Sequence, residues 1–358
     1  MTLTGRSLRS TITPDGTVQL RLIEELVPDP AGSEVLVAVQ ATPINPSDLG
    51  VLLGPADPAT LVSADGGLDG QVPERAIPIL RDRLDRPLPV GNEGAGTVIA
   101  AGPDASDLIG RHVSLVGGAM WSDYRLVDAS AVIPLPEDAT AADGAALFIN
   151  PMTALSMVET MRAENHTALV HTAAASNLGQ MLVKICQADG VGLVNIVRSP
   201  DQSATLTDLG ADHVVDSSQP DFADRLAEAV AATGATLAFD AVGGGTLAGD
   251  ILAAMEQSAE PSDRWTPYGS TMPKQVYIYG SLDMGPTTIR RTFGMRWSVG
   301  GYLLTDVLGR LAPEAIGRMR DRVLAELKTT FASSYAETIG LEDVLELDHL
   351  AAFAKRST

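Results

Sequence analysis

The chain has 358 residues, of which 45% are hydrophobic, and it carries a formal net charge of −20 at pH 7. This length and composition predict a globular protein with a sizeable core and two domains. The negative charge opposes binding to nucleic acid or to an anionic membrane surface, because an acidic field repels polyanions.

Two further features bear on where the protein works. The sequence has no run of about twenty apolar residues that could span a membrane, and its N-terminus lacks the charged-then-apolar pattern of a secretory signal. A single cysteine, Cys186, excludes an intramolecular disulfide. We therefore expect a cytoplasmic protein without a membrane partner.

The first part of the chain, residues 1–140, is expected to be rich in β-structure. Short apolar runs punctuated by proline and glycine predict strands, the clearest being Glu34–Val39, Gly96–Ala100 and His112–Val116. The segment 55–89 exceeds ordinary connection lengths. It either covers the mouth of a substrate site or forms a surface insertion, because long loops concentrate function but also tolerate change.

From residue 141 to residue 320 the pattern alternates between helix and strand, which predicts a doubly wound parallel sheet. Helix formers dominate Asp224–Ala232. The predicted strands are Ala168–Thr172, Val191–Val197, His213–Val215, Leu237–Val242 and Gln275–Gly280. The tail, 321–358, is expected to return to the first domain.

The turn after the first of these strands is typical of a dinucleotide site. An apolar strand leads into small residues and then an apolar helical stripe, the unit that seats a pyrophosphate against a helix N-terminus. Small side chains and a single glycine line the turn, and we expect cofactor contacts from Ala174, Ser176, Asn177, Leu178 and Gly179. The alternative is an ordinary crossover of any α/β protein.

The second strand ends at Arg198 and Ser199, which indicate which cofactor is bound. A site for NADH usually has an acidic residue here, whereas a 2′-phosphate needs a cation. A guanidinium can hold that phosphate bidentately, and the serine hydroxyl adds a donor. NADPH is therefore the expected cofactor, although Arg198 could also be an ordinary surface arginine.

Five motifs in a fixed order resemble those of one enzyme family. They are Ile44–Asp48 (INPSD), Gly91–Val98 (GNEGAGTV), Leu135–Asp138 (LPED), Ala145–Ala154 (AALFINPMTA) and Asp240–Gly244 (DAVGG). This order is similar to that of the medium-chain dehydrogenase/reductases, in their zinc-independent quinone reductase and enoyl reductase branch. The resemblance implies a GroES-like β-barrel domain (1–140 with 321–358) and a Rossmann domain (141–320), with a cofactor cleft between them.

The same resemblance implies roles for particular residues. Asn45 and Asp48 would be catalytic, with the Asn45 amide donating to the substrate and Asp48 orienting a neighbour or a water. The residues themselves equally allow a structural turn with side-chain-to-backbone bonds. Glu93 is better interpreted as a carboxylate that braces its turn. The expected cofactor contacts are Thr153, Val242, Gly243, Tyr279, Gly280 and Ser281.

Metal ligands of the zinc-dependent relatives are missing from this sequence. Asn92 stands where those relatives have histidine, and a lone cysteine cannot supply a thiolate set. The five histidines, His112, His166, His171, His213 and His349, are scattered singly, so we read each as a surface or strand-end residue. We therefore expect no metal, and a hydride passed from the nicotinamide to a quinone or an enone.

Two alternative functions and the formation of a homodimer stay open. Enoyl thioester reductases of this branch place a tyrosine soon after the Asn-Pro motif, and Gly50–Asp57 contains none. A non-catalytic NADPH-binding protein is the second alternative, because the glycine fingerprint is eroded. A homodimer is expected from the dimerisation of relatives and from the insertion Glu256–Lys274, which contains Trp265 and Tyr268. The ending Ala354–Thr358 also departs from the glycine-lysine strand usual in relatives.

Overall fold

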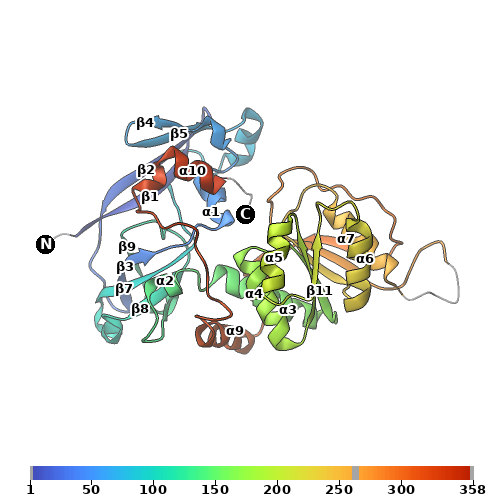
Figure 1. The fold of residues 1–358 in the computed structure, drawn as a ribbon. Helices are drawn as coiled ribbons and strands as arrows, with labels where there is room; N and C mark the ends of the chain where they lie inside the picture. The colour runs from blue at the N-terminus through green and yellow to red at the C-terminus, as the bar shows by residue number, and fades with distance from the viewer. Residues whose placement is uncertain (1–2, 260–265, 355–358) are drawn as a thin grey trace. The chain divides into compact units, whose positions relative to one another are not determined.

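The computed structural model describes residues 3–259 and 266–354 and divides the chain into two compact units (Figure 1). Among the described residues, the antiparallel unit comprises 3–149 and 332–354, and the parallel unit comprises those between 150 and 331. The sequence placed these divisions at 140 and 320. Trp265 and the last four residues lie outside the described residues. In the part of the chain that is described, every helix is too short or too polar to cross a membrane.

The antiparallel unit is built from two five-stranded sheets, with strand orders β4-β5-β2-β1-β6 and β10-β8-β7-β3-β9. Helices α1 (Pro46–Leu52), α2 (Ala141–Gly144) and α10 (Leu347–Ala354) complete it. Its strands are β1 (Thr4–Ile12), β2 (Thr17–Leu26), β3 (Glu34–Ala41), β4 (Val62–Ala64), β5 (Gly67–Gln71), β6 (Leu88–Pro89), β7 (Glu93–Ala101), β8 (His112–Val116), β9 (Tyr124–Asp128) and β10 (Val132–Pro134).

The segment 55–89 supplies strands to the first of these sheets. Strand β5 pairs with β2 and β4, and β6 pairs with β1. Leu61 and Leu68 are buried in the same apolar cluster as Leu8 and as Leu350 of α10. Residues 55–89 are therefore part of the core of the antiparallel unit, because they form both edges of its sheet and bury apolar side chains within it.

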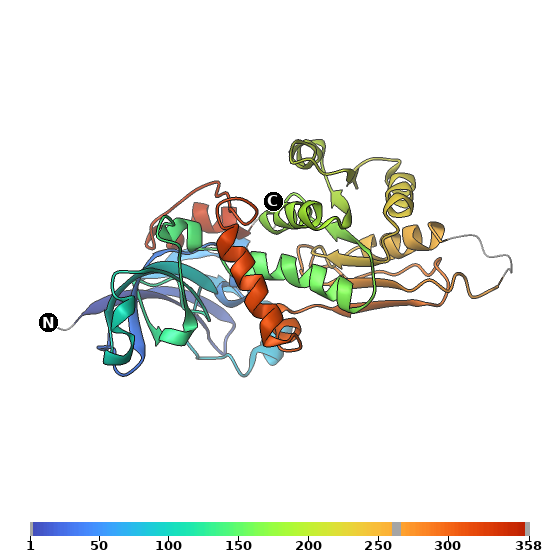
Figure 2. The same cartoon turned by 90° about the horizontal axis from the view of Figure 1, so that it is seen from below.

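The parallel unit is a six-stranded sheet in the order β13-β12-β11-β14-β15-β16, with helices on both faces (Figures 1 and 2). Its strands are β11 (Ala168–Thr172), β12 (Gly192–Val197), β13 (His213–Asp216), β14 (Leu237–Asp240), β15 (Lys274–Ile278) and β16 (Trp297–Gly301). Its helices are α3 (Ile149–Ala163), α4 (Asn177–Asp189), α5 (Pro200–Asp208), α6 (Phe222–Thr233), α7 (Leu247–Gln257), α8 (Leu304–Leu308) and α9 (Pro313–Ala325).

This strand order is that of the Rossmann fold, and it confirms the predicted α/β class with a doubly wound sheet beside a β-rich unit. One face of the sheet, including Val170, Val194 and Ile196, packs on α6 and α7. The sequence analysis missed β16 because Trp297–Gly301 ends in glycines and has no apolar run.

A buried ion pair closes the base of the Glu256–Lys274 insertion. The Lys274 side chain is fully buried, and its Nζ lies 2.6 Å from Glu256 Oε2 and donates to Ser270 Oγ and Met272 O. Glu256 also accepts from the Ser270 backbone and hydroxyl, each at 2.7 Å. The pair therefore joins the end of α7 to the start of β15. Tyr268, in the same insertion, is 67% exposed.

Replacing Lys274 by methionine should destabilise the parallel unit, because it leaves the Glu256 carboxylate without its cation. Removing one partner of a buried pair costs about 3–5 kcal/mol, which we reduce to roughly 2–4 because Glu256 is partly exposed. Equilibrium urea unfolding measures the loss. Adding Glu256→Gln to Lys274→Met should recover part of the lost stability. The control is Arg81→Met, which removes one partner of an exposed pair and should cost under about 1 kcal/mol. A Lys274→Met loss no larger than that control would contradict the role of the pair.

Candidate functional site

The carboxyl ends of four parallel strands gather most of the predicted cofactor residues at one edge of the sheet. Strands β11, β12, β14 and β15 run in the same direction and in register. Predicted cofactor residues follow shortly after β12, β14 and β15, and the turn Ala174–Gly179 follows β11. The residues concerned are Arg198, Ser199, Val242, Gly243, Tyr279, Gly280 and Ser281. Open α/β sheets bind ligands at this edge.

The turn after β11 is tight although it carries one glycine. Ala174 is buried, and the Ser176 hydroxyl caps α4 by accepting from Gly179 N at 3.2 Å. A Cβ on Gly179 would lie 2.2 Å from the Ala174 carbonyl oxygen, so only glycine fits there. Asn177 and Leu178 form the first turn of α4, where backbone N–H groups lack helical partners. The turn therefore offers the close backbone approach that a phosphate needs.

Arg198 and Ser199 differ in whether their side chains already make hydrogen bonds within the protein. The Arg198 side chain is exposed, and among residues 3–259 and 266–354 its guanidinium has no hydrogen bond or ion pair. Ser199 caps α5, because its hydroxyl accepts from Gln202 N at 3.3 Å. Arg198 is thus available to an anion, whereas Ser199 already holds a helix end.

The sequence analysis did not identify Asp240 as the residue that shapes the turn after β14. Asp240 is fully buried, and its Oδ1 accepts from Thr172 Oγ1 at 2.8 Å and from Val242 N at 2.9 Å. Its Oδ2 accepts from Gly243 N at 3.2 Å. A carboxylate at the end of a buried strand was the available signal, because such a group must find donors nearby.

Glycines let the segments after β14 and β15 lie against each other. Gly243 has φ +80°, and a Cβ there would lie 2.7 Å from the Gly280 carbonyl oxygen. A Cβ on Gly280 would lie 2.4 Å from Ala241 O. Ser281 beside them is exposed. Thr153 lies apart from this edge in sequence, in the first turns of α3, and is 7% exposed.

Tyr279 is partly buried and pairs with a histidine that the sequence predicted to be a surface or strand-end residue. His171 is fully buried and is the last residue but one of β11, so it lies near a strand end but not at the surface. Its Nε2 lies 2.7 Å from the Tyr279 hydroxyl, and the two rings stack with centroids 5.8 Å apart. Burial lowers the pKa of His171 to about 3 and raises the pKa of Tyr279 above its usual range. Both rings are therefore neutral near pH 7.

In the antiparallel unit the predicted catalytic residues are buried at the start of α1. Asn45 is 4% exposed, and its Nδ2 donates to Glu93 Oε1 at 2.9 Å. Both oxygens of Asp48 accept backbone N–H groups, from Asn45 at 2.7 Å and from Asn92 at 2.8 Å. Burial raises the pKa of Asp48 to about 6, against the lowering effect of those two donors. Asp48 thus holds the Asn45 turn in place.

Glu93 links that turn to the last residues of the antiparallel unit, as its sequence interpretation as a bracing carboxylate anticipated. It is fully buried at the start of β7, and its Oε2 accepts from the backbone of Phe148 at 2.9 Å and of Ile149 at 2.8 Å. Burial raises the pKa of Glu93 to about 7, while its three donors act to lower it. The carboxylate therefore fixes the position of the Asn45 amide.

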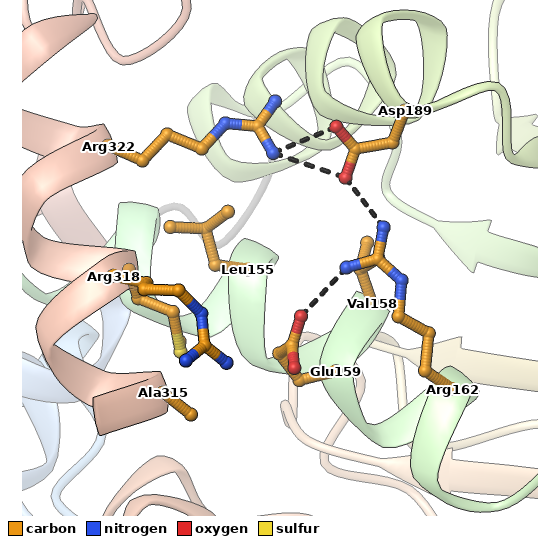
Figure 3. A pocket seen from close by; sticks show the side chains of 9 residues that line it. Leu155, Val158, Glu159, Arg162, Asp189, Ala315, Arg318 and Arg322 are labelled. Carbon is orange, nitrogen blue, oxygen red and sulfur yellow. Dashed lines mark hydrogen bonds and ion pairs between the residues drawn. The ribbon is translucent and has the colours of Figure 1, made fainter. Parts of the chain in front are cut away.

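A separate surface pocket of about 170 Å³ lies between α3, α4 and α9 (Figure 3). Arg322 Nη1 donates to both oxygens of Asp189, at 2.9 and 3.1 Å, and Arg162 links Asp189 to Glu159. None of the predicted site residues lines this pocket. Its charged side chains mainly hold α9 against α3 and α4. Among the described residues, no three His, Cys, Asp or Glu side chains are grouped so that they could hold a metal ion.

Comparison with known proteins adds independent findings on the fold. Residues 178–290 match the family described as zinc-binding dehydrogenase. The mitochondrial enoyl-[acyl-carrier-protein] reductase of Xenopus tropicalis is 28% identical over 75% of this chain and 68% of its own length. The enzyme of that name from Rattus norvegicus is 30% identical over 56% of this chain, and the match spans about half of its length, 49%.

Two solved structures match almost the whole chain. One, described as a candidate NADPH:quinone reductase from Mesorhizobium loti, is 27% identical, with a TM-score of 0.72 and coverage of 98% of this chain and 97% of that one. The complex of Etr1p with NADP and crotonyl-CoA is 20% identical, with a TM-score of 0.68 and the same coverage. Together with the strand order and the five motifs, these matches support the resemblance of the chain to the medium-chain dehydrogenase/reductase superfamily, in its quinone oxidoreductase and enoyl reductase branch.

Proposed function

We propose that this protein is an NADPH-dependent oxidoreductase that transfers hydride to a quinone or an enone without a metal. The observation that carries the proposal is the exposed guanidinium of Arg198 at the carboxyl end of β12, which has no hydrogen bond or ion pair with the residues that the structure describes. In a Rossmann sheet this position faces the adenosine ribose, and a cation there suits a 2′-phosphate. Relatives of known structure were solved with NADP or NADPH, which supports the choice.

The turns at the sheet edge fit such a cofactor. Gly179 lets the first turn of α4 pack closely on the backbone of Ala174, and the N–H groups at the start of α4 would be donors to a pyrophosphate. Gly243 and Gly280 keep the later turns free of Cβ atoms. Because the whole protein is strongly acidic, this local set of donors must outweigh a repulsive field. Arg198 supplies the one full positive charge in our predicted set.

The remaining site residues would hold and orient the substrate. When bound, the reduced nicotinamide supplies the hydride. We assign the second N–H of the Asn45 amide to the substrate oxygen, where negative charge develops during reduction. Glu93 orients that amide, and Asp48 holds its turn through two backbone donors. Asp48 therefore acts on the substrate only through Asn45.

An enoyl thioester is the second candidate acceptor, because several relatives are named enoyl-[acyl-carrier-protein] reductases. The segment Gly50–Asp57 still offers no tyrosine to donate a proton to the product. A protein that binds NADPH without turnover is the remaining alternative. A homodimer also stays a prediction, resting on the relatives and on the insertion whose described end carries the exposed Tyr268.

Arg198→Ala should weaken binding of NADPH by roughly ten- to hundredfold and binding of NADH by less than about threefold, because only NADPH carries the 2′-phosphate. Isothermal titration with both cofactors measures the difference. Arg225→Ala is the matched control, since it removes the same charge from an exposed position on α6. Equal losses for the two cofactors would exclude Arg198 as the phosphate ligand.

Purified protein should oxidise NADPH when a quinone or an enone is added, and a chelator should leave the rate unchanged. The measurement is NADPH absorbance with quinones, enones and enoyl thioesters, each with and without chelator. A zinc-dependent alcohol dehydrogenase treated in the same way shows that the chelator works. Turnover of enoyl thioesters alone would favour the second acceptor, and a loss of rate with chelator would refute the metal-free mechanism.

Glu93→Gln should change how stability depends on pH. Because the folded pKa of Glu93 is raised from 4.5 to about 7, wild-type unfolding free energy should fall as pH rises through that interval. Glutamine does not titrate. The free energy of unfolding of the variant should therefore rise relative to that of wild type by about 1–3 kcal/mol between pH 5 and pH 8. Urea unfolding at several pH values tests this, with exposed Glu137→Gln as control. Parallel profiles for wild type and Glu93→Gln would show that Glu93 is charged throughout.

A further inference from the structure

Two buried polar atoms on neighbouring strands lack hydrogen-bond partners among the described residues. They are Nδ1 of His171 on β11 and Oδ1 of Asn195 on β12. The two residues are direct register partners in the parallel sheet, so their side chains lie on the same face next to each other. His171 is fully buried and Asn195 is 1% exposed. Buried polar atoms are rarely left unpaired, so this juxtaposition needs an explanation.

The orientation of the Asn195 amide is fixed by its neighbours. Its Nδ2 donates to the His213 carbonyl at 3.2 Å and to the Leu193 carbonyl at 3.5 Å. A flipped amide would set oxygen against oxygen at both positions. His213 belongs to β13, which pairs with β12 on the side away from β11. The amide oxygen therefore faces the β11 side, where His171 lies.

This acceptor decides which nitrogen of the neutral His171 ring carries the proton. No hydrogen bond joins Nδ1 of His171 to Oδ1 of Asn195 in this structure. With hydrogen on Nε2, both of these atoms would be acceptors on adjacent register partners, whereas with hydrogen on Nδ1 one is a donor and the other an acceptor. Nε2 is then the acceptor for the Tyr279 hydroxyl, which lies 2.7 Å away.

We propose that Asn195 holds His171 as the Nδ1–H tautomer, so that Tyr279 donates its hydroxyl proton to His171 and offers a ligand only an acceptor oxygen. At the end of β15 that oxygen would take an N–H of the nicotinamide carboxamide. This last step rests on the proposed function. Tyr279 is thus a cofactor-recognition residue and not the proton donor of the reaction, and Asn195 and His171 are positioning residues that act through it.

The tautomer is measured directly by long-range ¹H–¹⁵N NMR of the ligand-free protein. Wild-type His171 should show a protonated Nδ1 and an unprotonated Nε2, its signals being assigned by their loss in His171→Gln. Asn195→Leu should shift the population toward the other tautomer, while the other four histidines serve as internal controls. A protonated Nε2 in wild type overturns the proposal even if no variant folds.

The role of Tyr279 is tested with a cofactor that lacks the amide N–H. Tyr279→Phe should weaken NADPH binding by roughly three- to tenfold, the range for one neutral hydrogen bond. The 3-acetylpyridine analogue of NADPH has no N–H to give, so wild type and variant should bind it equally. Equal losses for both cofactors, or a hundredfold fall in kcat with unchanged KM, would overturn the assignment. Failure of wild type to bind NADPH would instead refute the proposed function and leave the tautomer result standing.

Discussion

Buried carboxylates that accept backbone N–H groups set the loops of both units. Asp240 orders the turn after β14, and Glu93 and Asp48 together fix the start of α1. Removing a carboxylate from water is costly unless donors replace the lost hydration. Each of these groups meets that requirement with donors from segments distant in sequence or from its own turn. The site loops are therefore rigid, because moving them would leave a buried oxygen unsatisfied.

This constraint explains why two residue types recur at the parallel edge. A carboxylate draws the turn tightly around itself, and glycine then removes the Cβ atoms that would collide with the next turn. Gly243 and Gly280 do so on either side of the contact between the turns after β14 and β15. The result is that the turns after β14 and β15 pack directly on each other, backbone against backbone.

The sequence predicted those parts of the fold and site that depend on local pattern. Apolar strands such as Ala168–Thr172 match the structure, because a strand buried on both faces is a continuous apolar run. Strand β16 was missed since an edge strand needs no such run. The pairing of His171 with Tyr279 was also missed, because the two residues lie on separate strands and only the sheet order brings them together. Long-range pairs of this kind leave no spacing that a sequence pattern could show.

The hydrogen-bond direction of Tyr279 also bears on which acceptor suits this site. Reduction of an enoyl thioester needs a proton delivered to carbon, and carbon is protonated slowly unless an acid is positioned beside it. Reduction of a quinone leaves negative charge on oxygen, which exchanges protons with water rapidly and needs only a donor such as Asn45 to stabilise it. Under the proposed tautomer of His171, the Tyr279 phenol donates its proton to that ring and so does not serve as the carbon acid. On this proposal the predicted site residues suit an acceptor that is protonated on oxygen, which favours the quinone over both the enone and the enoyl thioester, because each of these two must gain a proton on carbon.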